Sequence, residues 1–188
     1  MHNEQQIIEG CLKNSRKAQK MLYDKYAAKF LGMCIRYAKD RLEAEDILQD
    51  GFLKIFGRIS QYSGLGSFEG WMKRIIVNTA ITNYRQNLKH YYKQHIDEVN
   101  ETDIESSIYD VEYTLEELLK VIKDLPPGYK MVFNMFAIEG FQHKEIAEMM
   151  GIDVTTSKSQ YSRARKLLRQ KLEDLKKEKM VFENNGEL

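Results

Sequence analysis

Apolar residues recur with helical spacing along the first half of the chain. The pattern runs from about Glu4 to about Tyr92 and breaks near Asp40 and again over residues 61–67. The second break contains the sequence Tyr-Ser-Gly-Leu-Gly-Ser, which is typical of a loop because glycine and serine favour turns over helices. The pattern therefore predicts a first domain built from several helices.

A second helical pattern follows after a polar stretch. Residues 94–112 are rich in acidic side chains and lack an apolar stripe, which predicts a linker that is flexible when free. Helical spacing resumes at Tyr113 and continues to about Met180, divided by a Pro-Pro-Gly turn and two further glycines into three or four shorter helices. We expect an all-α protein of two small helical domains, 1–93 and 113–180, joined by an acidic linker at 94–112 and followed by a tail at 181–188.

A short segment of the second domain has the pattern of a helix-turn-helix. The apolar residues Ile146, Ala147 and Met150 share one helical face. Gly151 is a natural terminator of that helix, and Asp153 is a natural cap for a helix that starts at Val154. Two helices are therefore predicted to meet across a very short turn.

The helix that starts at Val154 has two contrasting faces. At about 100° per residue, the packing sector holds Val154, Ser157, Tyr161, Ala164 and Leu168. The opposite sector holds basic side chains together with serine and threonine. Basic side chains can bond guanine, and small hydroxyl residues allow a close approach to base edges, so this face suits a major groove. The alternative is an ordinary solvated basic face. The candidate DNA-binding residues are Thr155, Lys158, Ser159, Ser162, Arg163, Arg165 and Lys166, and Arg165, Arg169 and Lys171 suit phosphates best.

The first domain carries an amphipathic helix with an acidic ridge. Ile47, Leu48, Phe52, Ile55 and Phe56 fall on one side of the segment 44–56. The other side holds Asp46, Gln49 and Asp50. Such a ridge could dock on a basic partner surface, although a solvated acidic face is the commoner meaning of the pattern.

Aromatic, amide and basic side chains are interleaved after the second break. Ser67 can cap a helix that carries Phe68, Trp71, Met72, Ile75 and Ile76 together with Lys73, Arg74, Asn78, Thr82 and Arg85. Single-stranded nucleic acid needs this mixture: an aromatic plane beside splayed bases, an amide for base edges and cations for the backbone. The alternative is that Trp71 belongs to the core and that the polar residues form a solvated edge.

Charge is segregated along a chain whose formal net charge is only +1. The segment from Asp97 to Asp124 has ten acidic and two basic side chains, whereas the segment from Val154 to Lys179 has nine basic and three acidic ones. A small net charge argues against a protein that holds DNA alone by bulk attraction. The basic segment attracts phosphate and the acidic one repels it.

Several other kinds of site lack a signal in the sequence. Cys11 and Cys34 have no CxxC spacing and no histidine cluster beside them, so neither a disulfide framework nor a metal site is indicated. There is no phosphate-binding loop, nucleophile elbow or paired catalytic carboxylates, so we expect no enzyme, no catalytic residue and no cofactor. No stretch approaches the length of a membrane span, which predicts a soluble, cytoplasmic protein.

Taken in order, four motifs resemble those of the extracytoplasmic-function (ECF) RNA polymerase sigma factors of the sigma-70 family, over about Met21 to Leu175. Each motif is weak alone, but the ordered set is specific. The motifs are Ala44-Glu45-Asp46 to Phe56, Trp71 to Asn78, Leu125-Pro126-Pro127, and Glu145-Ile146-Ala147 to Gly151 followed by Ser162-Arg163-Ala164-Arg165.

The resemblance implies roles for these segments. Asp46, Gln49 and Asp50 would bind the clamp coiled coil of the largest subunit of core RNA polymerase. The loop from Ser63 to Ser67 and the helix after it would melt the downstream promoter element and capture a flipped base, with Asn78 in base contact. The implied downstream residues are Ser63, Ser67, Trp71, Lys73, Arg74, Asn78 and Arg85.

The resemblance also implies that the helix starting at Val154 reads the upstream promoter element. Lys158, Ser159, Ser162 and Arg163 stand at the positions that face bases. Gln160 and Thr156 depart from residues common in the family, so the promoter sequence does not follow from the resemblance. The acidic linker would thread toward the RNA exit path, and the resemblance leaves room for an anti-sigma factor as a further partner.

Three other classes of function stay open at the level of sequence. A stand-alone helix-turn-helix regulator would bind its operator tightly by itself. A helical enzyme acting on nucleic acid would cleave it in a metal-dependent way. A purely structural helical scaffold would show no salt-dependent affinity for DNA.

Overall fold

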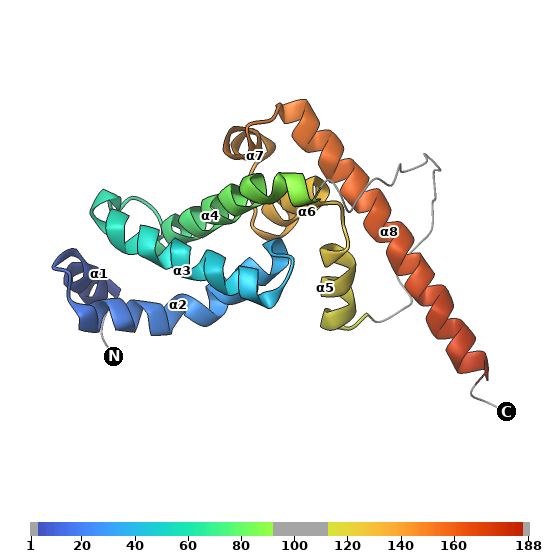
Figure 1. Ribbon diagram of the computed structural model, residues 1–188, viewed down its shortest axis with the longest axis horizontal. Coiled ribbons are helices and arrows are strands. Elements are labelled where there is room, and N and C mark those ends of the chain that lie inside the picture. Colours follow the sequence, from blue (N-terminus) through green and yellow to red (C-terminus); the bar gives the residue numbers. More distant parts are fainter. Residues whose placement is uncertain (1–3, 92–112, 186–188) are drawn as a thin grey trace. The chain divides into compact units, whose positions relative to one another are not determined.

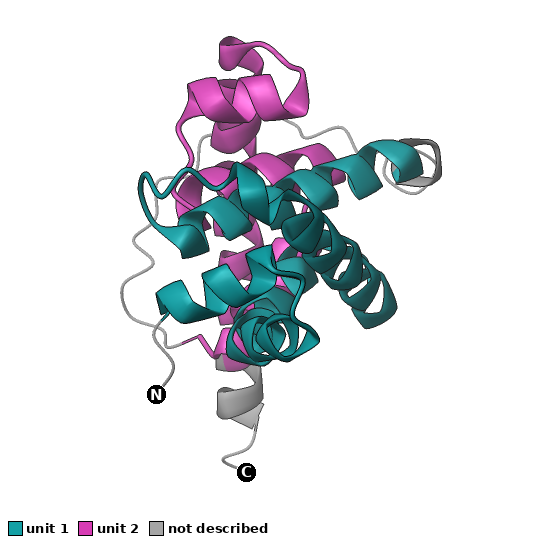
Figure 2. Ribbon diagram, turned by 90° about the vertical axis from the view of Figure 1, so that its left-hand side faces the viewer, with its two compact units in different colours: residues 1–87 teal, residues 88–188 magenta. Residues whose placement is uncertain are grey.

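The chain is all-α, as the hydrophobic pattern predicted. A computed structural model describes residues 4–91 and 113–185, and over those ranges every regular element is a helix (Figure 1). The chain divides into two compact units, residues 1–87 and 88–188, which are described separately (Figure 2). The predicted linker at 94–112 lies outside the described residues.

Unit 1 begins with two helices separated by a break that the apolar spacing did not predict. Helix α1 spans Glu4–Leu12 and α2 spans Arg16–Tyr37. Between them, Asn14 takes a left-handed conformation with φ of 56°, and the Ser15 hydroxyl accepts a hydrogen bond from the Ala18 N–H at 3.4 Å. Asparagine followed by serine is a recognisable end-and-cap signal, but the apolar spacing continues across it and conceals it.

The predicted break near Asp40 separates α2 from α3, which spans Arg41–Arg58. Asp40 caps α3 by accepting from the Glu43 N–H at 2.8 Å. The buried Glu43 carboxylate in turn accepts from the Lys39 N–H at 2.6 Å and from the Asn87 amide at 3.1 Å. Because Asn87 lies on α4 (Phe68–Tyr91), this one carboxylate ties the α2–α3 turn to the following helix.

The core of unit 1 lies among α2, α3 and α4. Ile47, Leu48, Phe52 and Ile55 are buried and Phe56 is half-buried, as expected for one face of α3. The largest fully buried side chains of the unit are Leu22, Phe30, Ile55, Met72, Ile76 and Ile81. The short 3₁₀ helix η1 (Ile59–Gln61) then leads into the loop that precedes α4.

Gly51 marks a close approach of α3 to α4, and its replacement by alanine should destabilise unit 1. A Cβ at Gly51 would lie 2.3 Å from Cδ1 of the fully buried Ile76, so the core must repack. Overpacking of this kind costs about 1–3 kcal/mol. We expect Gly51→Ala to unfold at lower urea concentration when followed by circular dichroism.

Gly57 provides the matched control because it lies on the same helix, and no atom lies within 4 Å of the place that a Cβ would take there. Gly57→Ala should be neutral or stabilise by up to about 1 kcal/mol, since alanine favours the helix. A Gly51→Ala variant as stable as Gly57→Ala would contradict the close packing described here.

Unit 2 contains α5 (Leu115–Lys123), α6 (Pro127–Phe133), the π-helix η2 (Asn134–Ile138), α7 (His143–Met150) and α8 (Val154–Asn185). Helices α5, α6 and α7 contact α8, and η2 contacts α6 and α7. Helix α7 lies beside the beginning of α8, and α5 lies further along it (Figure 1). A core cluster formed by Val121, Leu125, Ala164 and Leu168 joins α5, the α5–α6 turn and α8. Thr114 and Glu117 close a capping box at the start of α5.

Helix α8 is longer than the three or four shorter helices expected for this domain. It has 32 residues and extends to Asn185, into the stretch expected to be a tail. The physical reason is that neither glycine nor proline interrupts residues 154–185, so no residue ends the helix. Its distal half is held by α5 and the residues just before it: the Tyr113 hydroxyl donates to the Leu172 carbonyl at 3.0 Å, and Glu117 of α5 pairs with Lys179 at 2.9 Å.

Candidate nucleic-acid interface

The predicted helix-turn-helix is present, with the predicted turn. Gly151 ends α7 in the left-handed conformation at φ of 64°. The N–H of Ile152 donates back to the Ala147 carbonyl at 3.0 Å, which closes the helix end. Helix α8 begins at Val154, where the Ser157 N–H donates to the Asp153 carbonyl at 2.9 Å. Three residues therefore separate the two helices.

The exposed face of α8 contains the candidate DNA-binding residues. Thr155, Lys158, Ser159, Ser162, Arg163 and Arg165 are exposed, and Lys166 is half-buried. On the opposite face, Ser157, Ala164 and Leu168 are buried, as expected. Val154 was expected to pack but is 38% exposed, because as the first residue of the helix it lies at the end of the packed interface. The face that could enter a groove extends over about three turns, from Thr155 to Arg165.

Two of these basic side chains contact aromatic groups. The Arg163 guanidinium lies 3.5 Å from the Tyr129 hydroxyl of α6, at the limit of a hydrogen bond. Arg165 lies over the Tyr161 ring, 5.9 Å from its centroid. Contacts of this kind reduce the freedom of long side chains before they meet a ligand. The face is therefore partly organised in the free protein.

A polar and aromatic cluster, which sequence reasoning missed, fixes the beginning of α8. Nδ1 of His143 on α7 lies 3.0 Å from Oγ of Ser157 on α8. The imidazole stacks on Phe136 of η2, with ring centroids 4.2 Å apart and planes at 11°. Tyr161 closes the cluster, 4.6 Å from Phe136 and 5.8 Å from His143. No spacing in the sequence announces this cluster, because its members come from three elements.

His143 should make the stability of the protein depend on pH in a mildly acidic range. Burial, and secondarily the charge of Lys158, hold the pKa of His143 below its ordinary value of 6.5. The folded state therefore binds fewer protons than the unfolded state. The contribution of neutral His143 to stability is fully present above about pH 6.5 and is lost as pH falls through the folded-state pKa. Thermal unfolding should occur at a lower temperature at about pH 5 than at about pH 7.5.

The His143→Phe variant is the control for this prediction, since it keeps a ring and removes the titrating group. Its melting temperature should change less over the same pH range than that of the wild type. Equal pH dependence in the two proteins would show that other groups control stability there.

The predicted acidic ridge lies on the exposed face of α3. Asp46, Gln49 and Asp50 are all exposed, opposite the buried apolar side of the helix. The structure adds two leucines to this face: Leu42 is 70% exposed and Leu53 is 69% exposed. At spacings of four, three and four, Leu42, Asp46, Gln49 and Leu53 form one line along the helix, and together with Asp50 beside it they make up the α3 stripe. The signal was present in the sequence, because both leucines fall outside the apolar stripe of the helix.

The loop before α4 has a defined conformation. The Tyr62 hydroxyl donates to the Gly66 carbonyl at 2.8 Å, and the Leu65 N–H donates to the Ser63 hydroxyl at 3.4 Å. Gly64 and Gly66 have φ of 77° and 81°, a region that suits glycine. Between them Leu65 is 85% exposed. The loop therefore presents an apolar side chain at its tip, flanked by the exposed Ser63 and Ser67.

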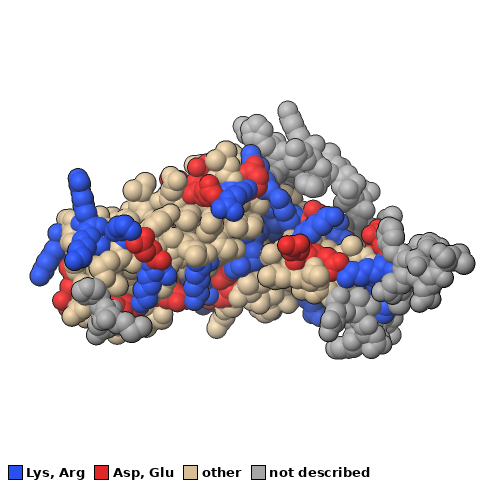
Figure 3. Space-filling model, turned by 90° about the horizontal axis from the view of Figure 1, so that it is seen from below, with Lys and Arg blue, Asp and Glu red and all other residues tan. Residues whose placement is uncertain are grey.

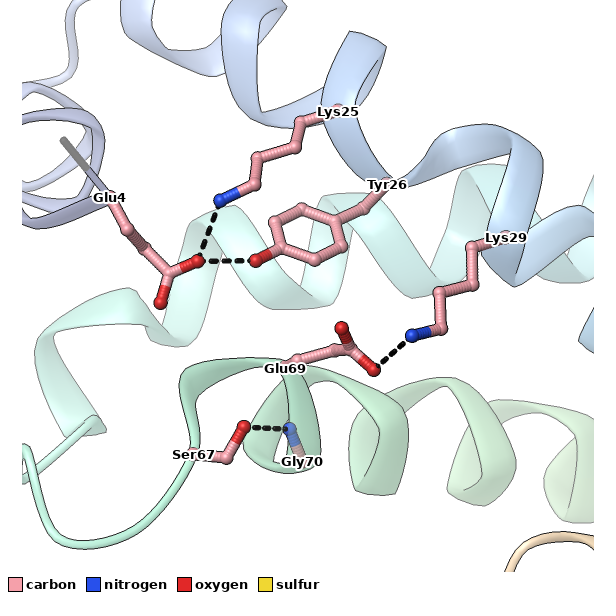
Figure 4. Close-up of polar contacts among 7 residues, drawn as sticks. All are labelled: Glu4, Lys25, Tyr26, Lys29, Ser67, Glu69 and Gly70. Atoms are coloured by element: carbon pink, nitrogen blue, oxygen red, sulfur yellow. Dashed lines mark hydrogen bonds and ion pairs between the residues drawn. The ribbon is translucent and has the colours of Figure 1, made fainter. Parts of the chain in front are cut away.

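The first turn of α4 is anchored on both sides. Ser67 caps the helix as predicted, accepting from the Gly70 N–H at 3.2 Å (Figure 4). Lys29 of α2 pairs with Glu69 at 2.5 Å (Figure 4). Trp71 is half-buried and stacks on Phe68, with ring centroids 5.6 Å apart. Trp71 thus belongs partly to the core, as in the alternative interpretation of this segment, and partly to the surface.

Most of the candidate residues of α4 share one side of the helix. Arg74, Asn78 and Arg85 are exposed and follow Trp71 at three, seven and fourteen residues, spacings that keep them on one side. Lys73 is half-buried and, two positions after Trp71, lies on a different side. One side of α4 therefore carries, along its length, the ring edge of Trp71, the Asn78 amide and the guanidinium groups of Arg74 and Arg85. Lys73 is separate from them.

Other kinds of site have no support among the described residues. No group of three or more His, Cys, Asp or Glu side chains is placed there to hold a metal ion. Cys11 and Cys34 are buried, and burial raises the pKa of the Cys34 thiol to about 12. Across 4–91 and 113–185, none of the helices combines the length and apolarity that a membrane span requires. On the face shown in Figure 3, basic and acidic side chains lie close to one another.

Two family descriptions match the chain. "Sigma-70 region 2" matches residues 22–89, from α2 to α4. "Sigma-70, region 4" matches residues 115–168, from α5 into α8. The first match covers the three helices that form the core of unit 1, and the second contains the helix-turn-helix.

Similar proteins match over nearly the full chain. The "ECF RNA polymerase sigma-E factor" of Haemophilus influenzae is 27% identical over an alignment of 183 residues, which covers 92% of this chain and 96% of that protein. The "RNA polymerase sigma-H factor" of Pseudomonas aeruginosa is 27% identical over 190 residues, with 93% and 96% covered. The sigma-E factor of Escherichia coli K12 is 26% identical, with 92% and 95% covered.

Two solved structures share the fold. The sigma factor RpoE of Bartonella quintana, solved with the anti-sigma factor NepR, aligns with a TM-score of 0.56 at 19% identity, covering 82% of this chain and 96% of that one. CnrH, solved with the cytosolic domain of CnrY, aligns with a TM-score of 0.53 at 17% identity, covering 89% and 96%.

Proposed function

The chain belongs to the extracytoplasmic-function group of the sigma-70 family, and from this premise we propose how its two units divide the work of a sigma factor. As a sigma factor it directs RNA polymerase to promoters and takes part in transcription initiation, rather than acting as a stand-alone regulator. The observation that carries the proposed division is the exposed face of α8 directly after the Gly151 turn, which bears basic side chains and the hydroxyl groups of serine and threonine.

Helix α8 reads the upstream promoter element in the major groove. Lys158 and Arg163 are placed to bond guanine edges, and Ser159 and Ser162 allow a close approach. Thr155, Arg165 and Lys166 contact the DNA backbone at the margins of this face. What supports the assignment is exposure of all these residues but Lys166, together with the burial of the opposite face of the helix.

Unit 1 opens the downstream element and holds the displaced strand. Asn78 contacts an unstacked base, Trp71 offers its ring edge, and Arg74 and Arg85 hold phosphates. Ser63 and Ser67 line the loop beside them, and Lys73 contributes from the other side of α4. Binding energy for the unpaired strand drives the opening, and the phosphodiester chemistry belongs to the polymerase, so the chain is not an enzyme and needs no cofactor.

The stripe on α3 binds core polymerase. Asp46, Gln49 and Asp50 face a basic surface on the clamp of the largest subunit, and Leu42 and Leu53 add apolar area at both ends of the contact. We place the protein in the cytoplasm, where the polymerase acts. An anti-sigma factor is a further proposed partner, since the similar sigma factor RpoE was solved in complex with the anti-sigma factor NepR.

The proposed division predicts weak binding of DNA by the protein alone. A net charge of +1 gives little general attraction, so affinity comes from holding two reading units at fixed spacing on the polymerase. Retention of labelled genomic fragments on filters, with the protein alone and with core polymerase added, tests this point. Specific retention only with polymerase supports the proposal, and tight specific retention by the protein alone refutes it.

A further inference from the structure

The beginning of the reading helix is held by a directional polar contact inside an otherwise apolar interface. Ser157 is 0% exposed, and its hydroxyl lies 3.0 Å from Nδ1 of His143. Burial of a hydroxyl is unfavourable unless it is hydrogen-bonded. Ser157 therefore favours the one arrangement of α7 and α8 in which the imidazole reaches it.

His143 is itself fixed in position. It stacks on Phe136, whose place is set by the π-helix η2, where the Glu139 N–H donates to the Asn134 carbonyl at 2.9 Å. Tyr161, one turn after Ser157 on α8, contacts both rings. The imidazole is thus confined by residues of η2 and α8, and its contact with Ser157 transmits that confinement to α8.

The position of this contact matters for base recognition. Ser157 directly precedes Lys158 on α8 and lies on the opposite side from Ser162. Side-chain tips lie about 5–6 Å from a helix axis, so a rotation of about 15° moves them by roughly 1.5 Å. Hydrogen bonds to base edges do not tolerate such a shift, because they weaken steeply with distance and angle. Apolar packing alone would leave this rotation less defined.

We propose that the His143–Ser157 hydrogen bond is a positioning contact that determines base preference at the upstream promoter element, by fixing the rotation of α8 about its axis. The inference rests on the proposed function of α8 and adds to it two residues that touch no DNA. Removal of the bond should broaden the sequence preference while the units stay folded.

The test uses the full chain with core polymerase and a promoter library randomised only at the upstream element. Sequencing of the transcripts gives the preference for each base. Ser157→Ala and His143→Phe both remove the bond, and the second keeps the ring for stacking. His143→Asn places an amide near the position of Nδ1 and should restore the bond. Discrimination should fall by roughly tenfold in the first two variants, within the range of a single base contact, and recover in the third.

Tyr113→Phe is the matched control for general destabilisation. It removes one side-chain hydrogen bond to the distal half of α8, to the Leu172 carbonyl, far along the helix from Ser157. Its base preference should equal that of the wild type. Wild-type preference in Ser157→Ala and His143→Phe would overturn the inference, as would an equal loss in Tyr113→Phe. A wild-type chain without any upstream preference would instead overturn the proposed role of α8, and this inference with it.

Discussion

Replacement of both Asp46 and Asp50 by lysine will strongly weaken the binding of core RNA polymerase. Both carboxylates are exposed on the outer face of α3, so they can meet a basic surface without rearrangement of the helix. Loss of one partner from a buried charge pair at an interface costs about 2–5 kcal/mol, and reversed charge adds repulsion. We expect the affinity to fall by at least about 100-fold in a titration of fluorescently labelled chain with purified core enzyme.

Asp24→Lys is the control for this reversal. Asp24 is an exposed acid on α2 whose pairing with Lys20 at 2.5 Å is a surface contact within one helix, and such contacts contribute less than about 1 kcal/mol. This variant should bind polymerase like the wild type. If Asp46→Lys/Asp50→Lys also binds normally, the α3 stripe is not the polymerase contact.

Replacement of Asn78 by alanine will slow promoter opening on duplex DNA. The amide is exposed on the side of α4 that also carries Trp71 and Arg74, and its loss would remove the proposed hydrogen bonds to an unstacked base. A contact of this kind contributes about 1–3 kcal/mol, which corresponds to an opening rate roughly 10- to 100-fold lower. Fluorescence of 2-aminopurine placed in the downstream element reports the opening directly.

A template with an unpaired downstream element separates opening from binding. On that template the strand is already separated, so Asn78→Ala should initiate at close to the wild-type rate. Gln86→Ala is the control, since it removes another exposed amide from α4, eight residues beyond Asn78 along the helix. An Asn78→Ala variant that opens duplex promoters normally would remove this residue from the account.

Caps and periodicity were sufficient to place the elements that carry the proposed contacts. The Gly151 turn, the start of α8 at Val154 and the Ser67 cap of α4 each depend on one or two adjacent residues. The outward residues of α3 and α8 follow from the helical repeat once the apolar face is recognised. Local signals of this kind survive folding because the tertiary structure reinforces them.

Features that depend on several elements at once could not be predicted in this way. No residue pattern distinguishes the π-helix η2 from an α-helix in the sequence. The stacking of Phe136 on His143 also requires that η2 and α7 be already in place. Ser157 was assigned correctly to the packing face, but its partner lies fourteen residues away on another helix. The exposed Leu42 and Leu53 were not predicted as part of a contact, because single leucines are common on protein surfaces.

Transcription by purified core polymerase on a pool of genomic fragments, with and without this protein, tests the central claim most directly. Start sites that appear only with the protein, and that weaken with Lys158→Ala/Arg163→Ala, are the result that the account predicts. The shared sequences upstream of those sites would define the promoter. Absence of new start sites, together with tight specific binding of duplex DNA by the protein alone, would contradict the account.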